Sequence, residues 1–255
     1  MIILDFATKV DRLQKISQDI YLKTITSLAT EMTEADIAES VRTEFRKKGI
    51  NYFWYDVPIS VLIGEDRFLT MAEKDYRIKS PSADVKLQRG NTIHIDMDLM
   101  DAEGNWGDFS ATSVFQPKSE IDYEKASFLT LIQKIQREGI KHLTSQTTAS
   151  QVARWYINKF KEENITLLDV RNTVGHSIHS GSKKYPDGRE KRMFLEEKNE
   201  TPLGEGVYAI EPGGFRKSIV GNGFVVGRFE DCVYIPPSGK PLILGNYDFL
   251  PVVCK

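Results

Sequence analysis

Acidic side chains recur on two neighbouring stretches whose pattern is typical of a β-hairpin. Residues 92–99 alternate, so Asp96 and Asp98 share one face of the expected strand. With a loop at residues 101–103, Asp96 lies opposite Asp108 on the return strand. Two carboxylates that face each other repel, and a metal ion between them removes the repulsion, because hard cations favour carboxylate oxygen. A solvated hairpin face with acidic residues is the alternative explanation.

Three later segments carry further side chains that can bind a metal. His176 follows a glycine. Glu211 ends an apolar run before a Pro-Gly turn, and a charged residue at the end of a buried strand needs a partner. Glu230 shares one face of a third segment with Arg228. Taken alone, each segment favours a plainer explanation, namely a histidine with satisfied hydrogen bonds, a structural ion pair or an exposed edge.

The order of these residues along the chain is more specific than any one of them. It resembles the methionine aminopeptidase and Xaa-Pro peptidase family, which includes prolidase and aminopeptidase P and shares the pita-bread fold with creatinase. The resemblance covers nearly the whole chain and is carried by Ile95-Asp96, Gly107-Asp108-Phe109-Ser110, Gly175-His176, Ile210-Glu211-Pro212-Gly213 and Phe229-Glu230-Asp231. It implies five metal ligands, which are Asp96, Asp108, His176, Glu211 and Glu230. Asp108 and Glu230 would bridge two ions.

The same resemblance implies the chemistry of the site. Four carboxylates and one imidazole suit two divalent metal ions, with Mn, Co or Fe expected and Zn also compatible. Such a pair of ions holds a bridging hydroxide and polarises a scissile carbonyl. Glu211 would take the proton from the attacking water, and His176 must be neutral to bind its ion.

Two positions depart from the family pattern. Peptidases of this family usually carry one histidine before the first aspartate ligand and another shortly after the histidine ligand, and both contact substrate. In this chain the two positions hold Lys79 and Lys183. A lysine ammonium can donate a hydrogen bond to a developing oxyanion. We therefore expect Lys79 and Lys183, together with Glu211, to be catalytic, with the metal site kept and substrate handling altered.

Other polar residues are expected close behind the ligands. Arg228 would pair with a carboxylate of the metal site, and His94 and His179 would contact the ligands from behind. A half-buried strand residue is the alternative for His94. Basic residues also cluster close to the expected site, at Lys183, Lys184, Arg189, Lys191 and Arg192. This cluster could attract an acidic substrate or a carboxyl terminus. The alternative is a solvated loop.

Periodicity and capping residues indicate the elements that position these side chains. Two helices are expected in the first 48 residues, and the second begins at Thr33, where Asp36 lies three residues on, close to a capping-box pattern. A strand is expected over residues 52–63, interrupted at Pro58. Its aromatic run Tyr52–Tyr55 either lines a pocket or belongs to the core, and the core is the favoured interpretation.

Two more helices are expected over residues 120–140 and 147–162, and residues after 165 alternate strand signals with Gly and Pro. This order favours an α+β fold over a doubly wound parallel sheet. The resemblance implies a curved, mostly antiparallel sheet covered by helices. It also implies a single pita-bread domain over residues 1–255, without a separate recognition domain.

Composition sets further limits. The 255 residues have a net charge of −2, which gives no overall signature of binding to nucleic acid or an anionic membrane. No apolar run is long enough to span a membrane, and the N-terminus has no basic segment followed by an apolar core. Two cysteines, Cys232 and Cys254, exclude a disulfide framework, so a reduced, cytoplasmic setting is expected.

The sequence thus predicts a dinuclear metal-dependent hydrolase resembling Xaa-Pro aminopeptidases and dipeptidases. It would cleave a peptide or amide bond near the N-terminus of a small substrate, and a homodimer is compatible with the sequence. The alternative is a pita-bread protein that is not a peptidase, because of Lys79 and Lys183. That alternative is either a creatinase-like C–N hydrolase or a peptide- or protein-binding module. A domain with solvated acidic residues and no metal is a third reading.

Overall fold

Long helices account for much of the chain that the computed structural model describes, residues 2–73, 78–169 and 171–254. The described helices are α1 (Ile2–Ser27), α2 (Glu34–Lys47), α3 (Glu65–Leu69), α4 (Glu120–Ile140) and α5 (Ala149–Glu162), with a 3-10 turn at Thr70–Ala72. The expected start at Thr33 is confirmed, because Thr33 and Asp36 form a capping box. The helix expected from residue 147 begins after Thr148, which caps it.

The strands are short and pair almost entirely in antiparallel fashion. They are β1 (Tyr52–Phe53), β2 (Ile59–Ile63), β3 (Thr92–Met97), β4 (Leu99–Met100), β5 (Phe109–Phe115), β6 (Thr166–Leu167), β7 (Gly175–Ser177), β8 (Gly206–Ile210), β9 (Gly213–Lys217), β10 (Phe224–Arg228), β11 (Asp231–Ile235), β12 (Leu242–Ile243) and β13 (Val253–Cys254). The sheet orders are β13-β5-β3-β2, β12-β11-β8-β7, β10-β9-β6 and β1-β4. The described strand pairs are antiparallel except β13 with β5, which confirms the expected mostly antiparallel α+β architecture.

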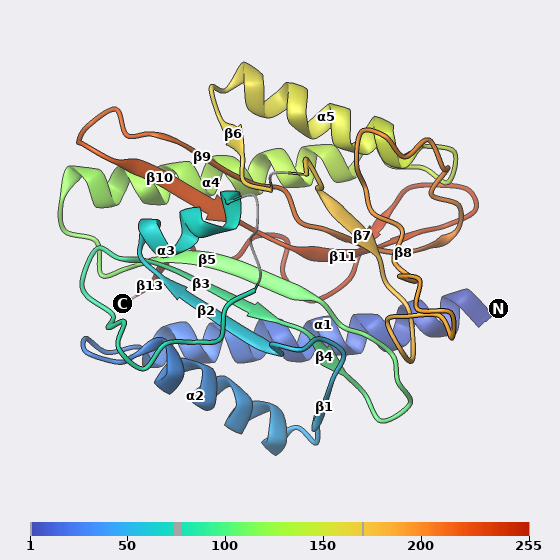
Figure 1. Cartoon of the computed structure of the whole chain (residues 1–255), viewed down its shortest axis with the longest axis horizontal. Coiled ribbons are helices and arrows are strands. Elements are labelled where there is room, and N and C mark those ends of the chain that lie inside the picture. Colours follow the sequence, from blue (N-terminus) through green and yellow to red (C-terminus); the bar gives the residue numbers. More distant parts are fainter. Residues whose placement is uncertain (1, 74–77, 170, 255) are drawn as a thin grey trace.

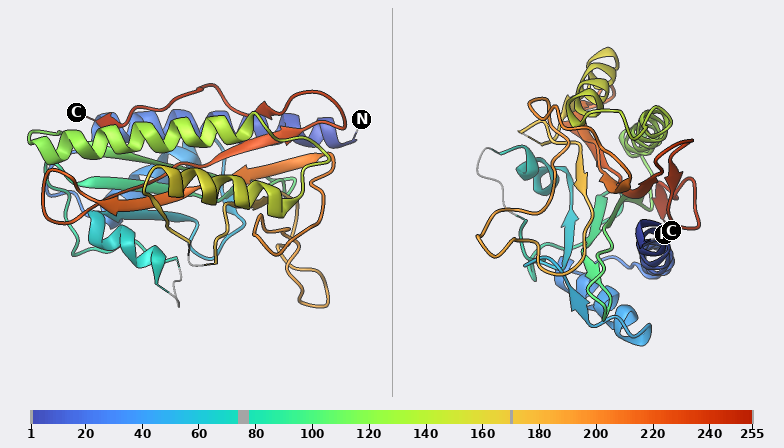
Figure 2. Two further views of the ribbon diagram at one scale, coloured as in Figure 1. Left: turned by 90° about the horizontal axis from the view of Figure 1, so that it is seen from above. Right: turned by 90° about the vertical axis from the view of Figure 1, so that its right-hand side faces the viewer.

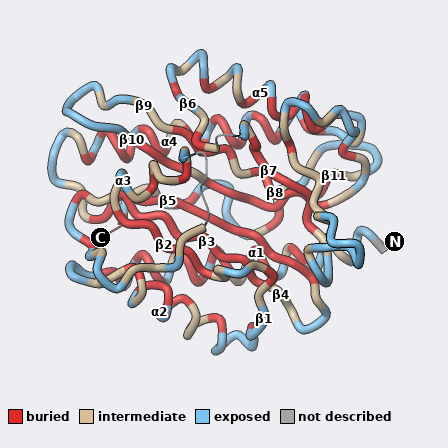
Figure 3. The backbone as a smooth tube through the Cα atoms, in the orientation of Figure 1, coloured by how far each residue is buried: buried red, intermediate tan, exposed pale blue. Residues whose placement is uncertain are grey.

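The sheets lie side by side, with helices against them (Figure 1). Helix α2 packs on β2, α4 packs on β10 and β5, and α1 contacts both β5 and β11. In Figure 2, right, α1 and α4 lie on one side of the strands, and α3 and the long loops lie on the other. The central strands are buried along most of their length (Figure 3). The loop side of the strands is therefore the side that is free to form a site.

The register of the β3–β5 hairpin differs from the expected one. Asp96 pairs with Ser110, so the expectation that it lies opposite Asp108 is wrong. Continuing the same register beyond the last paired residues of β3 and β5 sets Asp98 across from Asp108. The backbone agrees with this, because Gly107 N–H donates to the carbonyl of Leu99 at 2.8 Å.

The cause is the turn, which extends beyond residues 101–103. The carboxylate of Asp101 accepts hydrogen bonds from the backbone N–H groups of Glu103 and Asn105, both at 2.9 Å. A side chain that satisfies its own turn in this way stabilises a wider loop. The centre of the hairpin thereby moves by one residue, and each cross-strand partner moves by two.

The strand expected over residues 52–63 is split at the predicted place. β1 ends at Phe53 and β2 begins at Ile59, directly after Pro58, whose missing N–H cannot join a ladder. None of the described helices is long and apolar enough to cross a membrane.

Candidate metal centre

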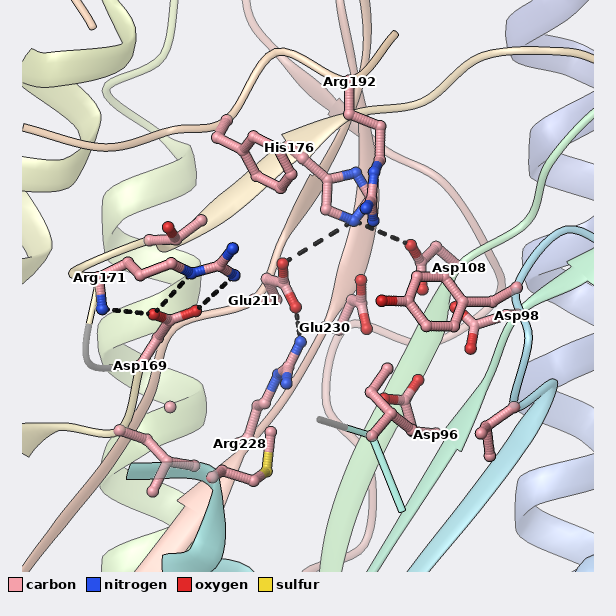
Figure 4. Close-up of a pocket in the computed structure, with 18 of the residues that line it drawn as sticks. Asp96, Asp98, Asp108, Asp169, Arg171, His176, Arg192, Glu211, Arg228 and Glu230 are labelled. Carbon is pink, nitrogen blue, oxygen red and sulfur yellow. Dashed lines mark hydrogen bonds and ion pairs between the residues drawn. The ribbon is translucent and has the colours of Figure 1, made fainter. Parts of the chain in front are cut away.

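A pocket of about 550 Å³ opens where the β3–β5 hairpin meets the ends of β7, β8 and β10. Figure 4 shows the acidic, histidine and arginine side chains that converge there. All five ligand positions implied by the sequence line it, and they are Asp96, Asp108, His176, Glu211 and Glu230.

The hairpin contributes three buried carboxylates. Asp96 lies on β3, Asp98 directly follows that strand, and Asp108 directly precedes β5. They are 7%, 4% and 2% exposed, respectively. These three carboxylates are therefore buried, which rules out the alternative that the hairpin presents a solvated acidic face.

His176 is held in place by the glycine that precedes it. Gly175 has a φ of +153°, and a Cβ there would lie 2.1 Å from the carbonyl oxygen of Ala209 on β8, so only glycine fits this close approach. The Nδ1 atom of His176 lies 3.1 Å from the carbonyl oxygen of Ser177. Its Nε2 atom lies 3.2 Å from Oδ2 of Asp108 and 3.9 Å from Oε1 of Glu211.

The two glutamates stand at strand ends. Glu211 follows β8 and forms an ion pair with Arg228 at the end of β10. Glu230 precedes β11, is 1% exposed, and its backbone N–H donates to the carbonyl of Ser110 at 2.9 Å. This backbone contact joins the two main sheets at the site itself.

Two buried glutamines fix the backbone beside the ligands. The Nε2 atom of Gln136 on α4 donates to the carbonyls of Ile210 and Phe229, at 2.8 and 3.1 Å, and each carbonyl directly precedes a glutamate ligand position. Gln14 on α1 donates in the same way to the carbonyl of Asp108 at 2.6 Å. Nothing in the sequence pattern pointed to either glutamine, because a polar residue on an amphipathic helix is ordinarily exposed.

Burial changes the acid–base behaviour of these groups. It raises the pKa of Asp108 to about 7, and the neighbouring Asp96 carboxylate adds to the rise. Burial also raises the pKa of Asp96, and it raises those of Asp98 and Glu230 well above their usual range. Burial, with Arg192 nearby, lowers the pKa of His176 to about 3, so the imidazole is neutral near pH 7.

The donor set fits divalent cations. Oδ1 of Asp96, Oδ2 of Asp98 and both carboxylate oxygens of Glu230 are buried and receive no hydrogen bond from the described N–H or hydroxyl groups. Buried carboxylate oxygens without donors are costly unless a cation compensates them. One ligand atom each from Asp108, His176 and Glu230 lie within 4.8 Å of one another, and so do atoms from Asp96, Asp98 and Asp108.

Residues 8–237 match the family model of "Metallopeptidase family M24". The chain belongs to this family. Members of the family use divalent metals, which agrees with the clustered acids and the buried neutral histidine. No curated protein sequence matches this M24 chain.

Solved structures share the fold of the M24 chain. An X-Pro aminopeptidase from Thermotoga maritima superposes with a TM-score of 0.71 at 20% identity, covering 96% of this chain and 62% of that one. A prolidase from Pyrococcus furiosus superposes with a TM-score of 0.70 at 18% identity, and the match covers 93% of this chain and 63% of the prolidase. A methionine aminopeptidase from Thermotoga maritima superposes with a TM-score of 0.71 at 15% identity, and the match covers 95% of this chain and 97% of the aminopeptidase. The expected pita-bread fold is confirmed. The chain spans less than two thirds of the first two proteins.

The two lysines expected at family histidine positions are not among the lining residues of the pocket, although neighbours of both are. Lys183 Nζ lies 3.3 Å from Oδ2 of Asp56 and 4.3 Å from the ring centroid of Tyr55, and both of these residues line the pocket. Lys79 is half-buried and follows Ile78, which lines the pocket as well. Their catalytic role stays a prediction.

The residues expected behind the ligands have separate partners. Arg228 pairs with Glu211, as expected. His94 Nδ1 lies 3.2 Å from Thr112 Oγ1, and that hydroxyl donates to the backbone carbonyl of Arg228, so His94 is connected to the site through backbone. His179 Nε2 lies 2.7 Å from the hydroxyl of Ser177, the residue after His176.

Three pocket residues come from segments for which the sequence left two interpretations open. Trp54 and Tyr55 line the pocket, which was the less favoured interpretation of their aromatic run, and Trp54 is also buried. Arg192, part of the basic cluster, lies over the rings of Trp54, Tyr55 and Phe194 at 5.3, 5.6 and 5.1 Å. The aromatic run and the basic cluster are both visible in the sequence, and the structure brings residues of both into one pocket.

Proposed function

We propose that the chain is a dinuclear metal-dependent hydrolase of the Xaa-Pro aminopeptidase or dipeptidase type, acting on a peptide or amide bond near the N-terminus of a small substrate. The observation that carries this proposal is the convergence of an Asp, Asp, His, Glu, Glu set in one pocket of an M24 family member. The residues are Asp96, Asp108, His176, Glu211 and Glu230.

These residues would hold two ions, with Asp108 and Glu230 shared between them. Mn, Co or Fe suits this oxygen-rich set with one imidazole. When bound, the ions would supply a nucleophilic water near neutral pH and polarise the scissile carbonyl. His176 is suited to bind because it is buried and neutral.

The remaining chemistry falls to the protein's own side chains. Glu211 would accept the proton of the attacking water at its carboxylate and return it to the leaving nitrogen. Arg228 forms an ion pair with Glu211 and so helps to position that carboxylate. Lys79 and Lys183 are the candidates for donating a hydrogen bond to the developing oxyanion.

Arg192 supports an anionic group on the substrate. Its guanidinium lines the pocket between aromatic rings, and its Nε–H is buried and has no acceptor among the described residues. Arg171 lines the same pocket, paired with Asp169 at 3.2 Å. A short peptide with a free carboxylate would match Arg192, since guanidinium binds carboxylate in two-point fashion.

Metal analysis and a substrate panel test the proposal together. After loading with Mn(II) or Co(II) and dialysis, we expect close to two ions per chain. The panel contains Xaa-Pro dipeptides, peptides with N-terminal Met, and cyclic amides, each measured with the wild type and with Asp108→Asn. Turnover of a peptide that is lost in Asp108→Asn supports a peptidase, and less than one bound ion per chain contradicts the proposal.

Lys79 and Lys183 favour one second candidate, a creatinase-like C–N hydrolase on the same metal centre. Both lysines stand where the family's peptidases usually carry histidines. Turnover of cyclic amides without turnover of any peptide would establish this alternative. A peptide-binding module, by contrast, would bind peptides equally well after Asp108→Asn.

A further inference from the structure

Asp98 is a buried carboxylate at the metal centre that the five-ligand set does not use. Its backbone is fixed on both sides, because its N–H donates to the carbonyl of Pro58 at 3.0 Å and its carbonyl accepts from Trp54 N–H at 3.2 Å. The hairpin register sets it across from Asp108. Asp98 follows Asp96 by two residues, so both side chains leave the strand on the pocket side.

The carboxylate of Asp98 forms no ion pair with the lysines and arginines that the structure describes. The residue is 4% exposed, and its buried Oδ2 accepts no hydrogen bond from the described residues. The nearby Arg192 forms its ion pair with Glu190, at 3.3 Å, and no ion pair joins a described lysine or arginine to Asp98. Figure 4 shows Asp98 beside Asp108 at the edge of the pocket. An uncompensated buried carboxylate calls for a cation.

The grouping of ligand atoms shows where that cation would sit. Asp108 belongs to two groups, one with His176 and Glu230 and one with Asp96 and Asp98, each within 4.8 Å. Charge balance agrees, because the carboxylate of Glu211 already has the guanidinium of Arg228 as its counter-ion. Four other carboxylates then remain to balance two divalent ions, and they are Asp96, Asp98, Asp108 and Glu230.

We propose that Asp98 is a sixth metal ligand, which completes an all-oxygen ion position together with Asp96 and Asp108. The inference rests on the proposed metal-dependent function. It also divides the two ion positions by chemistry, since carboxylate ligands alone favour a hard cation such as Mn(II) or Mg(II), whereas the position with His176 accepts softer ions as well.

Titration of metal into chelator-treated protein tests the role of Asp98. Isothermal titration with Mn(II) is compared for the wild type, Asp98→Asn and Asp169→Asn. The last variant removes a pocket carboxylate that has its own partner in Arg171. We expect two sites in the wild type and in Asp169→Asn. In Asp98→Asn we expect one site to be kept and the other weakened by at least about tenfold.

A second variant and a measurement of stability show whether a loss of metal binding comes from misfolding. Asp98→Ser is titrated alongside, and melting temperatures are recorded in chelator and in Mn(II). Because each change removes a buried carboxyl group whose Oδ2 has no hydrogen-bond donor among the described residues, both variants should melt in chelator no lower than the wild type. The Mn(II)-induced rise in melting temperature should shrink.

Two tight Mn(II) sites of wild-type affinity in both Asp98 variants would overturn the inference and leave the proposed function standing. Two sites in the wild type and one in the variants, without turnover of any peptide or amide, would support the inference and contradict the proposed function. A wild type that takes up no metal would overturn both.

Discussion

His176 Nε2 faces Oδ2 of Asp108 across 3.2 Å, and the other ring nitrogen of His176 lies 3.1 Å from a backbone carbonyl. A carbonyl only accepts, so the proton of the neutral ring belongs on Nδ1. Nε2 then turns a lone pair toward a carboxylate oxygen. Two acceptors at this distance repel unless a proton or a metal ion lies with them. The pair is therefore arranged for a cation, and its behaviour without one can be tested.

Without bound metal, the protein should lose stability as the pH rises. The pKa of Asp108 in the folded protein is about 7, above its ordinary value of 3.8. Between these values the folded state holds more protons than the unfolded state, so the free energy of unfolding falls as pH increases through that window. Urea unfolding in the presence of a chelator, at about pH 5 and about pH 8, measures the change against Asp108→Asn. An equal pH dependence in the two proteins would contradict the prediction.

Gln136→Leu should weaken the site from a distance. It removes the hydrogen bonds to the carbonyls of Ile210 and Phe229, which hold the backbone before Glu211 and Glu230. We expect a loss of about 1–3 kcal/mol in unfolding free energy, because two buried acceptors lose their donor. We also expect weaker Mn(II) binding, measured by titration.

The same helix offers a matched control, Gln133→Leu. Gln133 is also buried, and it exchanges hydrogen bonds with the backbone of Leu250, away from the metal site. It should lose similar stability but keep its metal affinity. Equal metal affinity in the two variants would show that Gln136 has no positioning role.

The ligand candidates could be predicted because their order along the chain resembles the ligand set of a known family. Taken alone, the alternation around Asp96 or the glycine before His176 would not have identified them. The register of the hairpin could not be predicted, since it depends on the Asp101 side chain widening its own turn. Gln136 escaped notice for a different reason. Its role arises only when a helix far away in sequence is packed against the strands.

Arg192→Met should impair binding of substrates that carry a free carboxylate. The guanidinium lies over Trp54 and Phe194, and a charged hydrogen bond lost there is worth about 10- to 100-fold in affinity. We expect KM to rise by that factor for a dipeptide and to change little for its C-terminal amide. Arg189→Met, an exposed arginine paired with Asp187, is the control. A KM that rises equally for the dipeptide and its amide would argue against a carboxylate partner.

Lys183→Met should lower kcat for the best substrate of the panel. The resemblance to the family implies a histidine at the position of Lys183, and the lysine lies beside Asp56 and Tyr55, which line the pocket. If its ammonium donates to the developing oxyanion, kcat falls by about 100-fold, as it does when one such donor is lost. Lys184→Met, which removes the exposed neighbour, should leave kcat unchanged. Steady-state kinetics separate the possibilities, because a lysine that only neutralises Asp56 would alter KM and leave kcat at the wild-type value.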